Sequence, residues 1–210
     1  IWKGLVGSEM CIRDRNELYI NNGDLTFTEM AADYGLDDTG YSTHAAFFDY
    51  DRDGDLDCYL LNNSYKGGFR ITNIGTNQRP IRDSVGGDKL FRNDDGYFND
   101  VSEESGIYGS VIGFGLGVTV GDVNNDGWMD IYVSNDFFER DYLYINNTDG
   151  TFSEELEYQI KSISAASMGA DMADINNDGY SEIFVTDMLP EPDERIKTVT
   201  TFDNWDRHQY

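Results

Sequence analysis

The chain has 210 residues, enough for one large domain or two small ones. Hydrophobic residues make up 39% and aromatic residues 14% of the chain, which excludes a disordered acidic tail. Its 40 Asp and Glu residues against 15 Lys and Arg residues give a formal net charge of −25, which argues against nucleic-acid partners and against an anionic membrane surface. No apolar run is long enough to span a bilayer, so we expect no membrane insertion.

The first segment, residues 1–15, matches none of the repeats that follow it. Its string GSEMCIRDR resembles translated sequencing-adapter read-through. We therefore expect either an artefact or a disordered leader there, and we assign it no function. The chain does not begin with Met and shows no signal peptide, and we expect both ends to be truncated.

Three internal repeats follow, and each opens with a short predicted strand, at residues 18–21, 90–93 and 143–146. A Gly-containing turn comes next in each repeat, which is typical of a β-hairpin. A second apolar run then leads to an acidic loop that starts at Asp49, Asp122 or Asp174. The distance from the opening Leu to this loop is 31, 32 and 31 residues, which indicates a true repeat.

A further predicted strand follows each acidic loop, at residues 58–61, 131–133 and 183–185. These strands are apolar on both faces, which is typical of a blade packed between two neighbours. Each repeat offers about four strands in roughly 45–50 residues, the size of a propeller blade. We predict an all-β partial propeller with these parts: blade 1 at 16–63, an inter-blade insertion at 64–89, blade 2 at 90–136, blade 3 at 143–188, and at 189–210 a connection to a missing blade.

The insertion at 64–89 is rich in basic residues, with five Lys and Arg: Lys66, Arg70, Arg79, Arg82 and Lys89. It is either a binding loop that projects from one face of the ring or a solvated connector whose charges balance an acidic surface. The sequence leaves both interpretations open.

The three acidic loops fit the pattern D-x-[DN]-x-D-G-x-x-[DE]. Side-chain oxygens at positions 1, 3 and 5, the backbone carbonyl at position 7 and the carboxylate at position 9 can surround one cation, while Gly at position 6 permits the sharp turn. The predicted metal-binding residues are Asp49, Asp51, Asp53, Asp55 and Asp57 in the first loop, Asp122, Asn124, Asp126, Trp128 and Asp130 in the second, and Asp174, Asn176, Asp178, Tyr180 and Glu182 in the third.

The oxygen-rich donor set favours Ca²⁺ over Mg²⁺, because Mg²⁺ requires a tight octahedron and retains its waters. An EF-hand would need a bidentate Glu at position 12 and flanking helices. Position 12 is instead Leu60, Val133 or Val185, inside an apolar strand, so the sequence excludes an EF-hand. We predict about three calcium sites, with the third weakest because Glu182 is one methylene longer than Asp.

The segments AAFFDYDRDGDLDCYLLNN (45–63), GFGLGVTVGDVNNDGWMDIYVSND (113–136) and SMGADMADINNDGYSEIFVTD (167–187) resemble the FG-GAP/VCBS repeat family. This family includes the α-integrin propeller repeats, and bacterial secreted VCBS repeat proteins of the cartilage-acidic-protein type look most similar. The resemblance implies a seven-bladed propeller with calcium in the blade hairpins, an extracellular or cell-surface location, and a role in adhesion. A literal Phe-Gly…Gly-Ala-Pro string is absent, and Phe114-Gly115 is only a partial echo of it.

The leading functional hypothesis is a calcium-stabilised binding module, not an enzyme, whose protein or glycan ligand docks on one propeller face. Aromatic residues that we consider for sugar stacking are Trp128, Phe137, Phe138 and Tyr142, although Trp128 is expected to pack over the metal. The alternative is the propeller domain of a polysaccharide-degrading lyase or a related carbohydrate enzyme. Against it, the only histidines are His44 and His208, and we expect His44 to be a packed or turn residue. A pocket that gathers a carboxylate, a base and arginines of 64–89 would favour the enzyme.

Overall fold

A computed structural model describes residues 15–64, 77–136, 139–164 and 166–187. The regular elements, in chain order, are β1 (Tyr19–Asn21), β2 (Phe27–Glu29), α1 (Ala31–Tyr34), β3 (Ser42–Phe48), β4 (Asp57–Asn62), β5 (Lys89–Asp94), β6 (Tyr97–Asp100), β7 (Gly115–Gly121), β8 (Asp130–Asn135), β9 (Tyr142–Asn146), β10 (Phe152–Glu154), α2 (Leu156–Gln159), β11 (Ser167–Ala173) and β12 (Glu182–Asp187). The two helices are single turns, so the fold is all-β as predicted.

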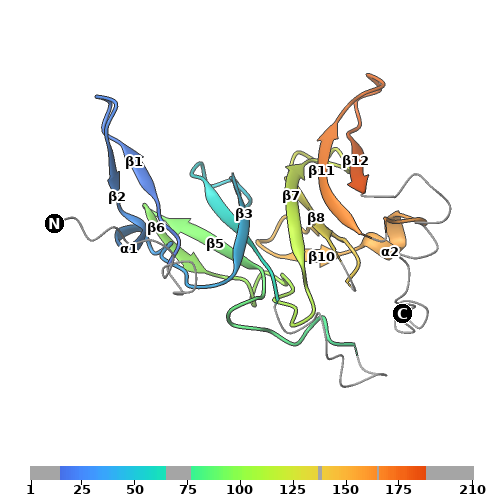
Figure 1. Ribbon diagram of the computed structural model, residues 1–210. Coiled ribbons are helices and arrows are strands. Elements are labelled where there is room, and N and C mark those ends of the chain that lie inside the picture. Colours follow the sequence, from blue (N-terminus) through green and yellow to red (C-terminus); the bar gives the residue numbers. More distant parts are fainter. Residues whose placement is uncertain (1–14, 65–76, 137–138, 165, 188–210) are drawn as a thin grey trace.

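The strands form four antiparallel sheets that stand side by side (Figure 1). Two sheets have four strands, in the orders β3-β4-β5-β6 and β7-β8-β9-β10, and two have only two strands, β1-β2 and β11-β12. The first strands of neighbouring sheets, β3, β7 and β11, pack against one another in series. This arrangement is consistent with propeller blades, and the sheets of the described residues do not close into a ring.

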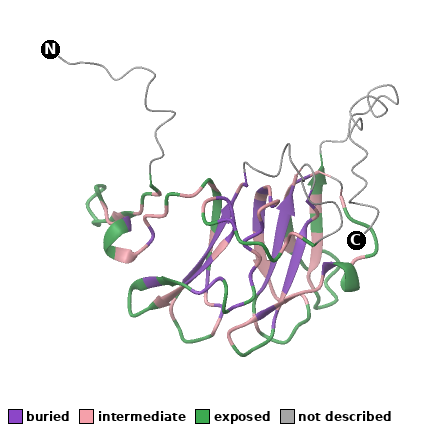
Figure 2. Cartoon of the chain, turned by 90° about the horizontal axis from the view of Figure 1, so that it is seen from below, coloured by how far each residue is buried: buried purple, intermediate pink, exposed green. Residues whose placement is uncertain are grey.

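The main core lies between the two four-stranded sheets, where buried residues gather on β4, β8 and β9 (Figure 2). Every residue of β4 and of β8 is buried. The prediction that the strand after each acidic loop is covered on both faces is therefore confirmed for these two strands. The corresponding strand β12 is only partly buried, because no further sheet among the described residues covers its outer face.

Glycines permit the close approach of the first strands. A Cβ atom added at Gly115 would lie 2.2 Å from Leu61 Cδ1, and one added at Gly117 would lie 2.9 Å from the Cα of Gly169. An irregularity of register recurs at the same place in β3, β7 and β11, next to these contacts. Gly115 and Gly117 of the GFGLG string thus serve packing between sheets.

The sheets begin and end at different places from the predicted blades. Strands β5 and β6 were expected to open the second blade at 90–136, but β5 pairs with β4, with Leu90 opposite Tyr59. In the same way β9 pairs with β8, and among the residues that the structure describes β11-β12 has no outer strands. The insertion at 64–89 therefore connects two strands of one sheet. A sequence repeat fixes the period of a fold but not the residue at which each structural unit starts.

The basic residues of the insertion that the structure describes are engaged within the fold. Arg79 pairs with the buried carboxylate of Glu139 at 2.6 Å, and Lys89 pairs with Asp38. Arg82 donates to the carbonyl of Ile107 at 2.7 Å. These contacts support the connector interpretation for this half of the insertion. Lys66 and Arg70, most of the leader 1–15 and the predicted connection at 189–210 lie outside the described residues.

Candidate metal-binding loops

The three acidic loops share one backbone conformation. Position 4 has a positive φ of 61–62° in each loop, at Arg52, Asn125 and Asn177, and position 6 is a Gly whose φ lies between 86° and 103°. Asn tolerates this left-handed conformation better than most residues, whereas Arg52 adopts it at a cost. The curl that the sequence pattern predicts is therefore present in all three loops.

The first Asp of each loop closes the curl by accepting a hydrogen bond from the Gly at position 6. The carboxylate Oδ2 to amide N distances are 3.2 Å for Asp49–Gly54, 2.7 Å for Asp122–Gly127 and 2.9 Å for Asp174–Gly179. The residue at position 5 also accepts from the amide at position 7 in each loop. Positions 1 and 5 thus turn their oxygens toward the centre of the loop.

The carboxylate at position 9 connects the first two loops to the next hairpin. Asp57 is fully buried and accepts from the amides of Tyr50 at 3.0 Å and Asn93 at 2.9 Å. Asp130 is equally buried and accepts from the amides of Val123 and Asn146, both at 2.9 Å.

The third loop departs from this arrangement. Glu182 accepts from the amide of Ile175 at 2.8 Å, as expected of position 9, but its other oxygen accepts from the side-chain amide of Asn176 at 2.6 Å. No strand follows β12 in its sheet among the described residues, so no counterpart of Asn93 or Asn146 reaches Glu182. Residues 174–180 of this loop are exposed, whereas Ser181 and Glu182 are partly buried.

The first loop brings three carboxylates to one point. Oxygens of Asp49, Asp51 and Asp57 lie within 4.8 Å of one another. Asp49 Oδ1 and Asp55 Oδ1 are inaccessible to solvent and have no hydrogen-bond partner. Within the described residues, the acidic side chains of the second and third loops do not converge in this way. The first loop is therefore the best-formed site.

Electrostatics in the first loop disfavour bare negative charge. Burial raises the pKa of Asp57 to about 6, although the amides of Asn93 and Tyr50 act in the opposite direction. Burial and the charge of Asp53 raise the pKa of Asp51. In the second loop, burial raises the pKa of Asp130. A bound cation would relieve the same desolvation and repulsion.

Position 7 carries a different side chain in each loop: Asp55 in the first, Trp128 in the second and Tyr180 in the third. The guanidinium of Arg52 lies over the ring of Trp128, 5.4 Å from its centroid, so the two residues connect the first and second loops. Tyr180 is exposed. Of the other aromatic residues considered for sugar stacking, Tyr142 is fully buried and is unsuited to that role, and Phe137 and Phe138 lie outside the described residues.

Sequence reasoning missed a second repeated polar feature. Asp88 accepts from the hydroxyl of Tyr59 at 2.9 Å, and Asp141 accepts from the hydroxyl of Tyr132 at 2.6 Å. Each Asp also accepts a hydrogen bond from a backbone amide at the end of the strand that carries the Tyr, from Asn62 to Asp88 and from Asn135 to Asp141. The signal was present as an Asp two residues before the opening Leu of two repeats, together with a Tyr two residues after position 9.

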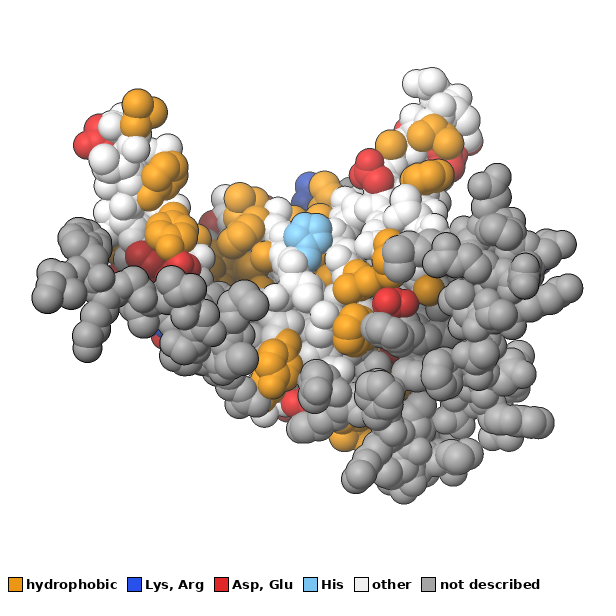
Figure 3. Space-filling model, in the orientation of Figure 1, with side chains coloured by type: hydrophobic (Ala, Val, Ile, Leu, Met, Phe, Trp, Pro, Cys, Tyr) orange, Lys and Arg blue, Asp and Glu red, His pale blue; other side chains and the backbone are white. Residues whose placement is uncertain are grey.

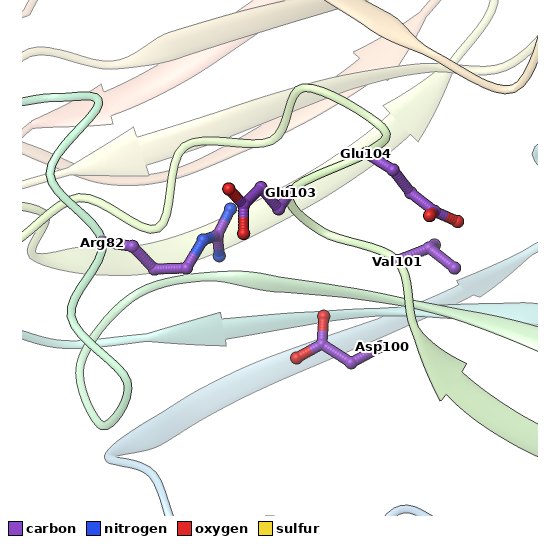
Figure 4. Close-up of a pocket in the computed structure, with 5 residues that line it drawn as sticks. All are labelled: Arg82, Asp100, Val101, Glu103 and Glu104. Atoms are coloured by element: carbon purple, nitrogen blue, oxygen red, sulfur yellow. The ribbon is translucent and has the colours of Figure 1, made fainter.

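A cavity of about 480 Å³ lies between two loops and is lined by Arg82, Asp100, Val101, Glu103 and Glu104. The side chains of Arg82 and Glu103 point toward each other across it (Figure 4). Asp100 already accepts from the amide of Ser102 at 3.1 Å. The cavity therefore combines one guanidinium with three carboxylates.

The two histidines lie outside this cavity or outside the described residues. His44 Nδ1 faces the amide of Val118 at 3.4 Å. His208 lies outside the described residues.

The loop and sheet pattern agrees with a comparison with known families. The family described as FG-GAP-like repeat matches residues 6–60, 81–133 and 122–185, which together span most of the chain. The chain belongs to the FG-GAP-like repeat family. The first two matched segments each end just after an acidic loop, and the third runs from the second acidic loop to just after the third, so the family pattern coincides with the repeats seen in the sequence.

Curated relatives include integrin alpha-3 of Mus musculus and integrin alpha-3 of Cricetulus griseus. Each is 29% identical over 99 residues, which cover 41% of this chain and 9% of the relative. The match thus spans less than a tenth of the length of those proteins. These findings support the FG-GAP family and not the bacterial cartilage-acidic-protein type that we expected. No helix within the described residues has the length and apolarity needed to cross a membrane.

Proposed function

We propose that this chain is part of an extracellular, propeller-type binding module in which Ca²⁺ acts structurally. The observation that carries the proposal is the first loop, where Asp49, Asp51 and Asp57 converge within 4.8 Å in a chain of the FG-GAP-like repeat family. The matches to integrin alpha-3 support an extracellular location and a role in binding a protein or glycan. Calcium then holds the loops in the shape that supports the sheets.

The residues present fit a calcium ion. Ca²⁺ takes six to eight oxygen ligands at flexible geometry. The first loop offers four carboxylates, at Asp49, Asp51, Asp53 and Asp57, and the inaccessible oxygen of Asp49 has no other partner. Burying carboxylate oxygens without a partner costs free energy, which a cation would offset. A metal bound at position 9 would also stabilise the sheet, because Asp57 accepts a hydrogen bond from the amide of Asn93 in the next strand.

The first test is thermal and urea unfolding of the 210-residue chain in EDTA, in magnesium and in calcium. Extracellular calcium modules bind with Kd near 10⁻⁴–10⁻³ M, so 10 mM calcium should stabilise the fold by about 1–3 kcal/mol per occupied site. Calorimetric titration should report about three sites, with the first loop tightest. Magnesium at the same concentration should give little stabilisation.

Two variants make this test specific. Asp51→Asn removes one carboxylate from the converging group and should abolish most of the calcium stabilisation that arises from the first loop. Asp33→Asn, on the exposed face of α1, makes the same charge change outside the loops and should leave the calcium response unchanged. Equal responses of the two variants, or no response of the parent chain, would refute the calcium proposal.

Ligand binding is tested separately, with glycan arrays and purified extracellular matrix proteins in calcium and in EDTA. We expect a ligand that binds only in calcium, because the loops shape the surface. If the protein binds calcium but binds its ligand equally well in EDTA, the proposed dependence of ligand binding on calcium is wrong.

A polysaccharide-degrading enzyme is the second candidate, and the observation that favours it is the cavity at Arg82. There an arginine of the insertion faces Glu103, with Asp100 and Glu104 nearby (Figure 4). Its test is the release of new reducing ends, or of unsaturated sugars, from a panel of anionic polysaccharides. An activity that Glu103→Gln abolishes would establish the enzyme; a chain that binds a glycan without cleaving it would support the binding module.

A further inference from the structure

An Asn near the end of β5 and of β9 connects each of the first two acidic loops to a hairpin. The backbone amides of Asn93 and Asn146 donate to the carboxylate at position 9 of the loop in their own sheet. Their side-chain amides donate to the carbonyl at position 8 of that loop, at 3.1 Å in the first loop and 3.4 Å in the second. Their side-chain oxygens accept from an amide of the hairpin turn at 2.8 Å. Each Asn thus holds an acidic loop against a hairpin.

Asn146 alone of this pair also reaches the neighbouring sheet. Its side-chain amide donates to the carbonyl of Tyr50, at position 2 of the first loop, at 2.8 Å. The amide of Tyr50 in turn donates to Asp57 at 3.0 Å, and the amide of Asn146 donates to Asp130 at 2.9 Å. A continuous path of three hydrogen bonds therefore joins the position 9 carboxylates of the two loops. Among the described residues, the side-chain amide of Asn93 donates only within its own sheet.

This path lies entirely inside the protein. Asp57 and Asp130 are fully buried, and Tyr50 and Asn146 are each 2% exposed. The ring of Tyr50 packs against Phe152 of the second sheet, with 5.9 Å between the ring centroids. Water cannot replace a partner that moves away in such a place, so a shift at one end of the path is costly unless the other end follows.

A second contact joins the same two loops at the surface. The guanidinium of Arg52, at position 4 of the first loop, lies over the ring of Trp128 in the second loop. Arg52 is exposed and adopts a φ of 61°, a conformation that Asn125 adopts in the second loop. The chain has few basic side chains to offset its acidic ones, as Figure 3 shows for one face. Arg52 therefore supplies a cation between two loops that repel each other while they are empty.

We propose that Asn146 is a positioning residue that couples calcium binding in the first and second loops, so that calcium in either loop strengthens binding in the other. Arg52 supports the same coupling at the surface. The coupling rests on the structural role of calcium proposed above. The third loop lies outside it, because among the described residues the hydrogen bonds of residues 174–180 stay within 174–182.

The physical basis is the order that the first ion imposes. Calcium in the first loop fixes Asp57 and the peptide of Tyr50 that is bonded to it. The carbonyl of Tyr50 then holds the side chain of Asn146, whose backbone amide is aimed at Asp130 before the second ion arrives. The second ion therefore has less chain left to order and binds more tightly. The effect must be equal in the two directions, because coupling between two binding sites is reciprocal.

The test is calorimetric calcium titration of the 210-residue chain with the third loop disabled by Asp174→Ala. Adding Asp122→Ala leaves only the first loop, and adding Asp49→Ala instead leaves only the second. Neither of these two side chains belongs to the buried path. The coupling factor is the constant for binding both ions divided by the product of the two single-loop constants. We expect a factor of about five or more in the parent.

Three variants locate the coupling. Asn146→Ala removes the donation to Tyr50 but keeps the backbone amide on Asp130, and it should bring the factor to about one. The matched control is Asn93→Ala, which removes the equivalent side-chain bonds within one sheet and should leave the factor as in the parent. Arg52→Asn suits the left-handed turn and lies at the surface, so it should fold even where the buried variant does not. It should lower the factor about twofold.

Hydrogen exchange supplies a readout that a merely structural role of Asn146 would not change. In the chain with Asp122→Ala and Asp174→Ala, only the first loop can bind calcium. Calcium should nevertheless slow the exchange of amides 142–147 in the second sheet, and the further change Asn146→Ala should abolish this protection. Circular dichroism shows whether each variant remains folded.

Two outcomes separate the coupling from the proposed function. A factor of one or less in a chain that binds calcium in both loops overturns the coupling and leaves the proposed function intact. A folded chain in which neither loop binds calcium refutes the proposed function and the coupling with it. Equal losses in Asn146→Ala and Asn93→Ala also overturn the coupling, since they would indicate a general loss of packing.

Discussion

Asp88 offers a sharp test of the buried polar pairs, because it is a carboxylate inside the sheet with few ways to relieve its charge. Burial raises its pKa from 3.8 to about 7, against the opposing effects of the Asn62 amide, the Tyr59 hydroxyl and the charge of Arg82. The folded protein therefore keeps a proton on Asp88 between about pH 4 and pH 7, where the unfolded chain has lost it. Stability must then fall as the pH rises through this window and level off above about pH 7.

The magnitude follows from the size of the shift. A displacement of about three pH units at about 1.4 kcal/mol per unit corresponds to roughly 3–4 kcal/mol between pH 4 and pH 7. Asp88→Asn cannot ionise, keeps one oxygen for the amide of Asn62, and loses this dependence. The variant should be slightly less stable than the parent at pH 4, by about 1 kcal/mol for the weakened hydrogen bonds. It should be more stable than the parent at pH 8.

The assay is urea unfolding followed by circular dichroism, at several pH values and at one calcium concentration for both proteins. The quantity of interest is the difference in unfolding free energy between parent and variant, because titration of the acidic loops is common to both. Asp33→Asn is the matched control and should run parallel to the parent. Parallel profiles of parent and Asp88→Asn would refute the argument, since they would mean that Asp88 has the same pKa in the folded and unfolded states.

Three further predictions concern packing, charge and reactivity. Gly115→Ala should destabilise the fold by about 1–3 kcal/mol in urea unfolding, because its Cβ would meet Leu61 Cδ1 at 2.2 Å; an unchanged midpoint would contradict the close packing of β7. Arg140→Met should cost about 3 kcal/mol by leaving the buried carboxylate of Glu154 without its partner at 2.5 Å, and a double variant with Glu154→Gln should recover part of the loss. Burial raises the pKa of the Cys58 thiol to about 12. Cys58 should therefore react with a disulfide reagent at pH 8 only when unfolding exposes it, at the rate of unfolding.

The sequence predicted the local features well because each depends on a few neighbouring residues. The left-handed turns at Gly54, Gly127 and Gly179 follow from the D-x-[DN]-x-D-G pattern, and two of the three strands after the loops are buried as their apolar runs indicate. The sheet boundaries were not predictable in the same way. The pairing of β4 with β5 depends on which strand is its spatial neighbour, and neither the hydrophobic pattern nor the repeat spacing indicates that neighbour.

The candidate sites also differ in how far sequence could define them. All fifteen predicted metal-binding residues lie in loops of one backbone shape, yet carboxylates converge only in the first loop among the described residues. The second loop shares the hydrogen bonds of the first but has Asn124 in place of a third converging carboxylate. The buried pair Tyr59–Asp88 was missed because its members are 29 residues apart and neither belongs to the acidic motif.

The third loop should hold calcium most weakly, because its side chains already bind one another. One oxygen of Glu182 accepts from the side-chain amide of Asn176 at 2.6 Å, and the amide oxygen of Asn176 accepts from the backbone amide of Asp178 at 2.8 Å. A cation must displace the first of these hydrogen bonds before Glu182 can ligate with both oxygens. Calorimetric titration should therefore place the third loop last in calcium affinity, and equal affinities of the three loops would contradict this reasoning.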